Sequence, residues 1–204
     1  MAPFFLAIIL LGCGLGKPYP AINTFNIEPP KVPALTAKSA RPLVILVNQL
    51  GVAAAYDNKK LIYKTRDGQM VEDFYNELVA PPSRLLADSQ AIYLDRALPF
   101  AQVVRIHGQK GADFILEGYL AQMLGDFSQE PPVARISLAV TFNDTRRDKA
   151  QILLAKTYEV EVAFDSPKDR PAPEFIQALN QAWSEILVSL TEDLTAWRQT
   201  QKKP

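Results

Sequence analysis

Residues 135–143 read RISLAVTFN and residues 151–164 read QILLAKTYEVEVAF, and these two stretches decide the fold. In both, apolar residues recur at every second position, and most of the positions between them are polar or small. A period of two with one apolar side indicates strands of an antiparallel sheet, packed on one face and wet on the other. The polar segment 143–149 is the predicted hairpin loop. Lys156 interrupts the apolar side, and we expect its stem to snorkel near the sheet edge.

A long amphipathic helix is predicted after this hairpin, over residues 174–198. Its apolar residues recur at helical spacing and form a wide stripe that includes Trp183 and Trp197. We expect this helix to lie across the packed face of the sheet, with both tryptophans in the core rather than lining a lipid groove. Pro81-Pro82-Ser83 opens a second helix that runs to about Arg96. The predicted fold class is α+β, a two-layer sandwich of a mostly antiparallel sheet packed by two helices.

Further strands are predicted on the amino-terminal side of the hairpin. The segment 69–79 stays ambiguous, because Met70, Phe74 and Leu78 have helical spacing although the turn signal Asp67-Gly68 precedes them. The run 43–47 is continuously aliphatic and predicts a strand buried on both faces. The predicted strands are residues 22–27, 43–47, 61–65, 103–106 and 114–124.

The chain begins with an apolar run, residues 4–11, that is too short to span a bilayer as a helix. It fits the apolar core of a secretion signal. Leu10-Leu11-Gly12-Cys13 resembles the lipobox of bacterial lipoproteins, which implies cleavage after Gly12 and acylation of the Cys13 thiol. The alternative is a buried amino-terminal segment with an incidental cysteine, since no Lys or Arg precedes the run. In lipoproteins of the enterobacterial type an Asp after the cysteine favours the inner membrane, so the resemblance implies the outer membrane for this chain, in which Gly14 follows Cys13.

The composition excludes several function classes. Lys and Arg together number 22, as do Asp and Glu, so the neutral balance gives no reason to expect nucleic acid as a partner. The sequence has one cysteine, Cys13, and one histidine, His107, from which neither a disulfide framework nor a clustered zinc site can be built.

No catalytic constellation is predicted. His107 follows a strand without a nucleophile elbow or a metal partner, and residues 108–111 are a turn rather than a phosphate loop. Three acidic residues, Glu72, Asp73 and Glu77, could converge, but a solvated face is the simpler interpretation. The loop tip 146–149 is expected to be solvated rather than to dock a partner. We therefore expect no enzyme and no catalytic, metal or cofactor site.

Four stretches carry a resemblance to a known family. They are YDNKKLIYK at 56–64, FYNELVAPPSRLL at 74–86, ADFILEG at 112–118 and ILLAKTY at 152–158. These patterns are similar to those of the ABC-type transport auxiliary lipoproteins, the PqiC-like group. In that group a strand occupies the start of the segment 69–79. The resemblance covers roughly residues 23–197.

The resemblance implies a periplasmic lipoprotein, held to a membrane by its lipid anchor, that serves an ABC-type lipid-transport system of the Gram-negative envelope. The implied partners are an ABC permease and ATPase and an MCE-domain substrate-binding protein. The family offers no catalytic residues to carry over. The chain is then divided into a signal peptide (1–12), a lipidated Pro-rich tether with one edge strand (13–40), the auxiliary α+β domain (41–198) and a polar tail (199–204).

Two other functions stay open. The first is an outer-membrane assembly or scaffolding lipoprotein with no direct transport role. The second is a secreted enzyme, which predicts a polar pocket of converging titratable groups. A second copy of the chain, in a homo-oligomer, is a further candidate partner.

Overall fold

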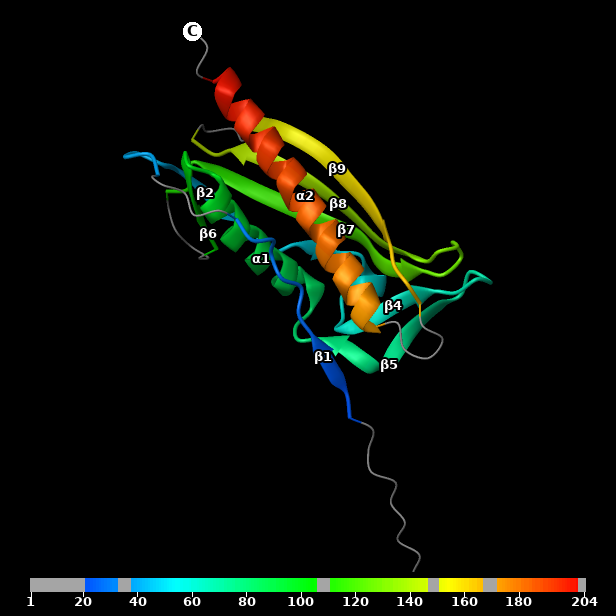
Figure 1. The fold of residues 1–204 in the computed structure, drawn as a ribbon. Helices are drawn as coiled ribbons and strands as arrows, with labels where there is room; N and C mark the ends of the chain where they lie inside the picture. The colour runs from blue at the N-terminus through cyan, green and yellow to red at the C-terminus, as the bar shows by residue number, and fades with distance from the viewer. Residues whose placement is uncertain (1–20, 33–37, 106–110, 147–150, 167–171, 202–204) are drawn as a thin grey trace, which may run out of the picture.

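The structure is a computed structural model that describes residues 21–32, 38–105, 111–146, 151–166 and 172–201. Cys13, the predicted signal sequence, His107 and the loop tip beyond Arg146 therefore lie outside the described residues. The elements, in order, are β1 (Asn23–Phe25), β2 (Leu43–Val47), β3 (Gly51–Val52), the short 3-10 helix η1 (Ala54–Tyr56), β4 (Lys60–Lys64), β5 (Met70–Leu78), α1 (Pro82–Ala97), β6 (Ala101–Val104), β7 (Phe114–Asp126), β8 (Val133–Asp144), β9 (Gln151–Ala163) and α2 (Ala172–Thr200). These elements confirm the α+β sandwich with two helices (Figure 1).

The predicted hairpin forms an antiparallel meander of three long strands, β7, β8 and β9. Leu138 lies opposite Leu120 of β7 on one side and Tyr158 of β9 on the other. The alternation is confirmed, because the even-numbered apolar residues of β8 from Ile136 to Phe142 are buried. Most polar side chains of β8 and β9 stand at odd-numbered positions, and Arg135, Ser137, Glu159 and Glu161 among them line the open face of the sheet.

One edge of β7 pairs with β8, and three short strands share the other edge. The sheet therefore divides into separate branches along that edge, an arrangement that we call the fork. β2, β3 and β4 pair with β7 one after another, at Phe114–Leu116, Tyr119–Leu120 and Gly125–Asp126, all in parallel. β6 extends the sheet beyond β2, and β5 and then β1 extend it beyond β4 (Figure 1). The long pairings are antiparallel, as predicted, whereas the short branches add parallel pairings that the sequence did not indicate.

The ambiguous segment 69–79 is a strand, β5, that pairs antiparallel with β4. Gly68 has a positive φ of 83°, which places the predicted Asp67-Gly68 turn between the two strands. The helical spacing is misleading because a large bulge interrupts the alternation of β5. Ile62 pairs with Glu72, and Lys60 pairs with Glu77. The chain therefore advances by two residues on β4 and by five residues on β5 between the same two pairs.

Both helices cover the packed face of the sheet (Figure 1). Pro82 stands in the first turn of α1, where a missing N–H costs nothing. The predicted core position is confirmed for Trp183, whereas Trp197 is partly buried and packs against the core. Trp183 is fully buried, and its indole Nε1 donates a hydrogen bond of 2.8 Å to Ser89 Oγ of α1. Trp197 packs edge-on against Phe114 and Phe142, with ring centroids 5.1 and 4.9 Å away.

The interruption of the apolar side at Lys156 has a specific cause. The Lys156 ammonium group lies 2.7 Å from the Asp193 carboxylate of α2, and the Tyr158 hydroxyl donates to the same carboxylate oxygen at 2.7 Å. The lysine therefore pairs with the covering helix, rather than simply extending its charge into water as the sequence suggested. Within the described residues, no helix combines the length and the apolar character that a membrane crossing requires.

Candidate functional site

The three predicted carboxylates do not converge on a site. Glu77 forms ion pairs with Lys59 at 2.7 Å and Lys60 at 3.3 Å, and Glu72 accepts a hydrogen bond from the Asn58 amide. The hydrogen bond from Lys59 holds the pKa of Glu77 below its usual value. Asp73 binds neighbouring backbone instead. The predicted solvated face describes Glu72, which is exposed, whereas Asp73 and Glu77 are only partly exposed and are engaged by neighbouring backbone and lysines.

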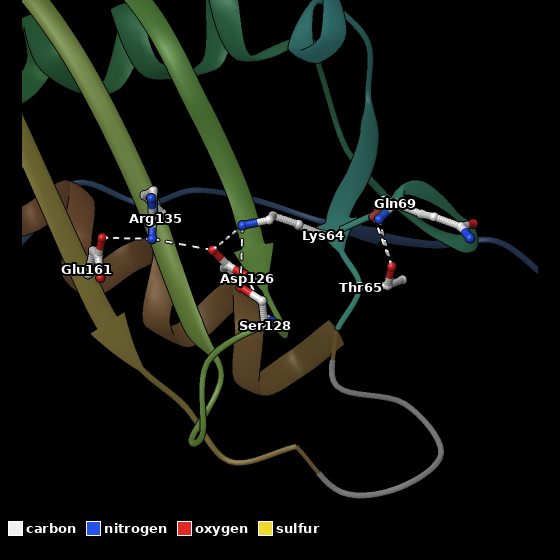
Figure 2. Close-up of polar contacts among 7 residues, drawn as sticks. All are labelled: Lys64, Thr65, Gln69, Asp126, Ser128, Arg135 and Glu161. Carbon is white, nitrogen blue, oxygen red and sulfur yellow. Dashed lines mark hydrogen bonds and ion pairs between the residues drawn. The ribbon is translucent and has the colours of Figure 1, made fainter. Parts of the chain in front are cut away.

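A polar cluster on the open face was missed by sequence analysis. It is centred on Asp126, at the end of β7, whose residue surface is only 1% exposed (Figure 2). Lys64 Nζ of β4 and Arg135 Nη2 of β8 each lie 3.3 Å from Asp126 Oδ2. The other oxygen, Oδ1, accepts hydrogen bonds from the backbone N–H of Ser128 at 2.9 Å and from its hydroxyl at 2.5 Å. Glu161 of β9 completes the cluster, 3.0 Å from Arg135 Nη2.

Electrostatics keep the Asp126 carboxylate ionised. Burial acts to raise its pKa, but the hydrogen bonds from Ser128 and the charge of Lys64 outweigh burial and lower the pKa below its ordinary value. A general base needs a pKa near the working pH, so this carboxylate is poorly suited to proton transfer. The cluster instead joins four strands, β4, β7, β8 and β9, and clamps one branch of the fork to the meander.

Beside the cluster the open face is hollowed into a shallow polar depression. Its lining residues are Gln122, Arg135, Ser137, Glu159 and Glu161. The Ser137 hydroxyl donates to Glu159 at 3.4 Å, and Glu161 is engaged by Arg135. Within the described part of the chain, no group of three His, Cys, Asp or Glu side chains is arranged to hold a metal ion.

Two residues of the motif at 112–118, which carries part of the family resemblance, have structural roles. Asp113 Oδ2 accepts the backbone N–H of Val44 at 2.8 Å, which ties β2 to the beginning of β7. Gly118 leaves room for the Leu50 side chain, since a Cβ there would lie 2.6 Å from Leu50 Cδ2. The motif at 112–118 therefore specifies how the first branch of the fork packs against β7.

Two adjacent, exposed aromatic residues form a second feature that sequence analysis missed. Phe74 and Tyr75 stand on the bulge of β5, 61% and 46% exposed, with ring centroids 5.1 Å apart in an edge-to-face arrangement. The only signals in the sequence were two adjacent aromatic residues at a break in the alternation. We call this pair and its supporting residues 73–76 the aromatic bulge.

The comparisons with known proteins support the fold. No family model matches the sequence, and no curated protein matches it by sequence. A Xanthomonas campestris protein described as belonging to the DUF330 family has a similar structure, with a TM-score of 0.73 and 17% identity over 90% of this chain and 99% of that one. An uncharacterized protein of known crystal structure matches with a TM-score of 0.67 and 16% identity, over 85% of this chain and 99% of that one.

Proposed function

We propose that the chain is a periplasmic lipoprotein, anchored to a membrane through Cys13, that serves as an accessory component of an ABC-type lipid-transport system. One observation carries the proposal: a lipobox at residues 10–13 precedes a domain whose fold matches that of a DUF330 protein across 90% of this chain. That match is consistent with the resemblance to the PqiC-like group, whose implied partners are a permease, an ATPase and an MCE-domain protein.

The described surface suits a role in assembly. The carboxylate cluster around Asp126 is neutralised by its own partners, so we expect it to hold strands together rather than to offer a reactive group. Among the described strands, β9 pairs only with β8, which leaves one edge of a 13-residue strand free. A free edge is a site at which an extended segment of a partner can add as a further strand. The outer membrane is the proposed location, because no Asp follows Cys13.

The test of the anchor uses the Cys13→Ser variant in cells supplied with a labelled fatty acid. The wild-type protein should incorporate the label and fractionate with membranes. The variant should lose the label and stay uncleaved, because its sulfur nucleophile is gone. An unmodified Cys13 in the mass spectrum of the native protein would contradict the proposal.

The test of the transport role is affinity purification of the cross-linked full-length protein from its own membranes. Recovery of an ABC permease, its ATPase or an MCE-domain protein, identified by mass spectrometry, is the expected result. An acylated protein that recovers outer-membrane assembly factors instead would support the scaffolding alternative. Genes for the three partners beside this gene would add independent support.

A further inference from the structure

The aromatic bulge is built to hold two aromatic rings in solvent. Between the pairs Ile62–Glu72 and Lys60–Glu77, β5 advances five residues while β4 advances two, so three extra residues leave the ladder. A bulge re-aims side chains without breaking the strand. Here it directs Phe74 and Tyr75 away from the core, although residues of this type are usually buried.

A single carboxylate holds the bulge in shape. Asp73 Oδ1 accepts the backbone N–H groups of Tyr75 at 2.8 Å and Asn76 at 3.0 Å. Asp73 Oδ2 accepts hydrogen bonds from the Asn76 amide at 2.9 Å and from the Tyr63 hydroxyl at 3.2 Å. Because these bonds fix the backbone beneath the rings, the pair is presented in one arrangement and little conformational freedom is lost when it binds.

The aromatic bulge lies beside the place where the chain arrives from Cys13. Asn23, the first residue of β1, pairs with Asn76, and its side-chain amide donates to Asn76 Oδ1 at 3.0 Å. Asn23 is ten steps along the chain from Cys13, so the acylated cysteine is at most about 36 Å of extended chain from the bulge. The hairpin end of β8 and β9 and the last turns of α2 lie at the opposite end of the molecule (Figure 1).

The surroundings of the bulge add apolar surface and three carboxylates, of which Glu77 is ion-paired, whereas the hydrogen bonds that Asp73 and Glu72 accept come from neutral groups. Ile22 and Val79, next to the paired ends of β1 and β5, are about half exposed. The nearby Glu77 carboxylate is paired with both Lys59 and Lys60, so it does not repel anionic headgroups as a free carboxylate would. The Tyr75 ring, which carries one polar end, is of the kind favoured at the boundary between headgroups and acyl chains, and Phe74 adds apolar surface beside it.

We propose that Phe74 and Tyr75 insert into the interfacial region of the bilayer that holds the Cys13 anchor. The bulge is then a second membrane contact, which fixes how the domain is oriented on its tether. This inference rests on the proposed acylation of Cys13. A lipid chain alone lets the domain rotate freely, whereas a lipid chain and a rigid aromatic pair define a direction.

The test compares two tryptophan substitutions in the full-length acylated protein. Phe74→Trp places the reporter on the bulge, and Ile152→Trp is the matched control, because Ile152 is 62% exposed and lies at the opposite end of the molecule. Each protein is reconstituted in vesicles of phosphatidylethanolamine and phosphatidylglycerol with brominated acyl chains. Bromine quenches only those tryptophans that reach the acyl region, and Trp183 and Trp197 supply the same background in both proteins.

The expected result is a blue shift and loss of most of the added emission for Phe74→Trp, with neither change for Ile152→Trp. Unquenched emission at position 74, in protein whose Cys13 is shown by mass spectrometry to be acylated, overturns the inserted bulge alone and points to a protein partner. Equal quenching of both variants also overturns it. An unmodified Cys13 overturns the proposed anchor. The unmodified Phe74→Trp protein is then mixed with the same vesicles, and unquenched emission from position 74 overturns the insertion as well.

Discussion

At the scale of single residues, Asp126 decides how the open face is held together. Its oxygens pair with the cations Lys64 and Arg135, which come from separate strands, and accept two hydrogen bonds from Ser128, which follows β7. Sequence analysis could place Asp126 near the end of a strand, but it could not find the cluster. The partners Lys64, Arg135 and Glu161 are brought together only by the order of strands in the sheet, which no local pattern encodes.

The Asp126→Asn variant should be less stable than the wild type. The amide keeps the shape but removes the negative charge that Lys64 and Arg135 face, and both cations are partly exposed, so water compensates for some of the loss. We expect a decrease of about 1–2 kcal/mol in the free energy of unfolding, measured by urea denaturation. Glu130→Gln, which disrupts the exposed pair with Arg66, is the control and should change it by less than about 0.5 kcal/mol. Equal effects of the two substitutions would contradict the role of the cluster.

The advantage of the wild type over Asp126→Asn should depend on pH. The pKa of Asp126 is lowered by folding, so the unfolded chain binds the proton more tightly and acid favours unfolding. The advantage should be constant at neutral pH and down to about pH 5, and it should shrink as the pH falls through and below the ordinary aspartate pKa of about 3.9. Urea titrations of both proteins over this range check the prediction. An advantage that grows as the pH falls would reverse the assigned sign.

At the scale of elements, sequence analysis succeeded where periodicity was uninterrupted. β8 and β9 follow a period of two and α2 follows helical spacing over many residues, so their type was predictable. β5 was ambiguous because three extra residues shift the alternation between Glu72 and Glu77. Met70 and Phe74 are exposed and Leu78 is buried, so the three residues with helical spacing do not share one environment.

The aromatic bulge should depend for its stability on Asp73 and not on its rings. Phe74→Ser with Tyr75→Ser should change the free energy of unfolding by less than about 0.5 kcal/mol, because exposed side chains contribute little. Asp73→Ala should lower it by about 1–3 kcal/mol, because several donors lose their acceptor. Thermal or urea unfolding of both variants gives the comparison. A strongly destabilised serine variant would mean that the rings serve packing instead of binding.

The two covering helices should be coupled through Trp183 and Ser89. Trp183→Phe removes the indole donor from a fully buried site, and Ser89→Ala removes its acceptor. Each variant should lose about 1–3 kcal/mol of stability, and the double variant should lose less than the sum, because the second change leaves no new group unsatisfied. A double-mutant cycle by denaturant unfolding measures the difference, and strict additivity would argue against the coupling.

At the scale of the whole molecule, the two-layer arrangement was predictable and the forked sheet was not. Apolar faces on strands and helices require a partner layer, which leaves few arrangements for these elements. The continuous aliphatic run of β2 indicated burial, yet three parallel neighbours along one edge of β7 depend on contacts between distant parts of the chain. The packing roles of Asp113 and Gly118 emerged only with that topology.

Loss of the anchor should change where the protein resides without changing its fold. We expect the Cys13→Ser protein to lose the membrane association that acylation provides, because each buried methylene contributes about 0.8 kcal/mol to binding. Near-ultraviolet circular dichroism of the purified variant should match that of the wild type, since the aromatic contacts around Trp197 and Phe114 are far along the chain from residue 13. A changed aromatic spectrum would place Cys13 in the packed domain.

The short β1 strand is the element that we expect to detach first when the amino terminus of the domain is pulled. Tension between an anchored amino terminus and a partner held at the far end would load β1 before any other element, because the chain reaches the sheet there. Only three residues of β1 are in register with β5, whereas β7 and β8 are matched along nearly their whole length. Under such tension β1 would detach first and lengthen the tether, and the rest of the sandwich would stay folded. The detachment of β1 would then limit the force that the membrane anchor transmits to the rest of the domain.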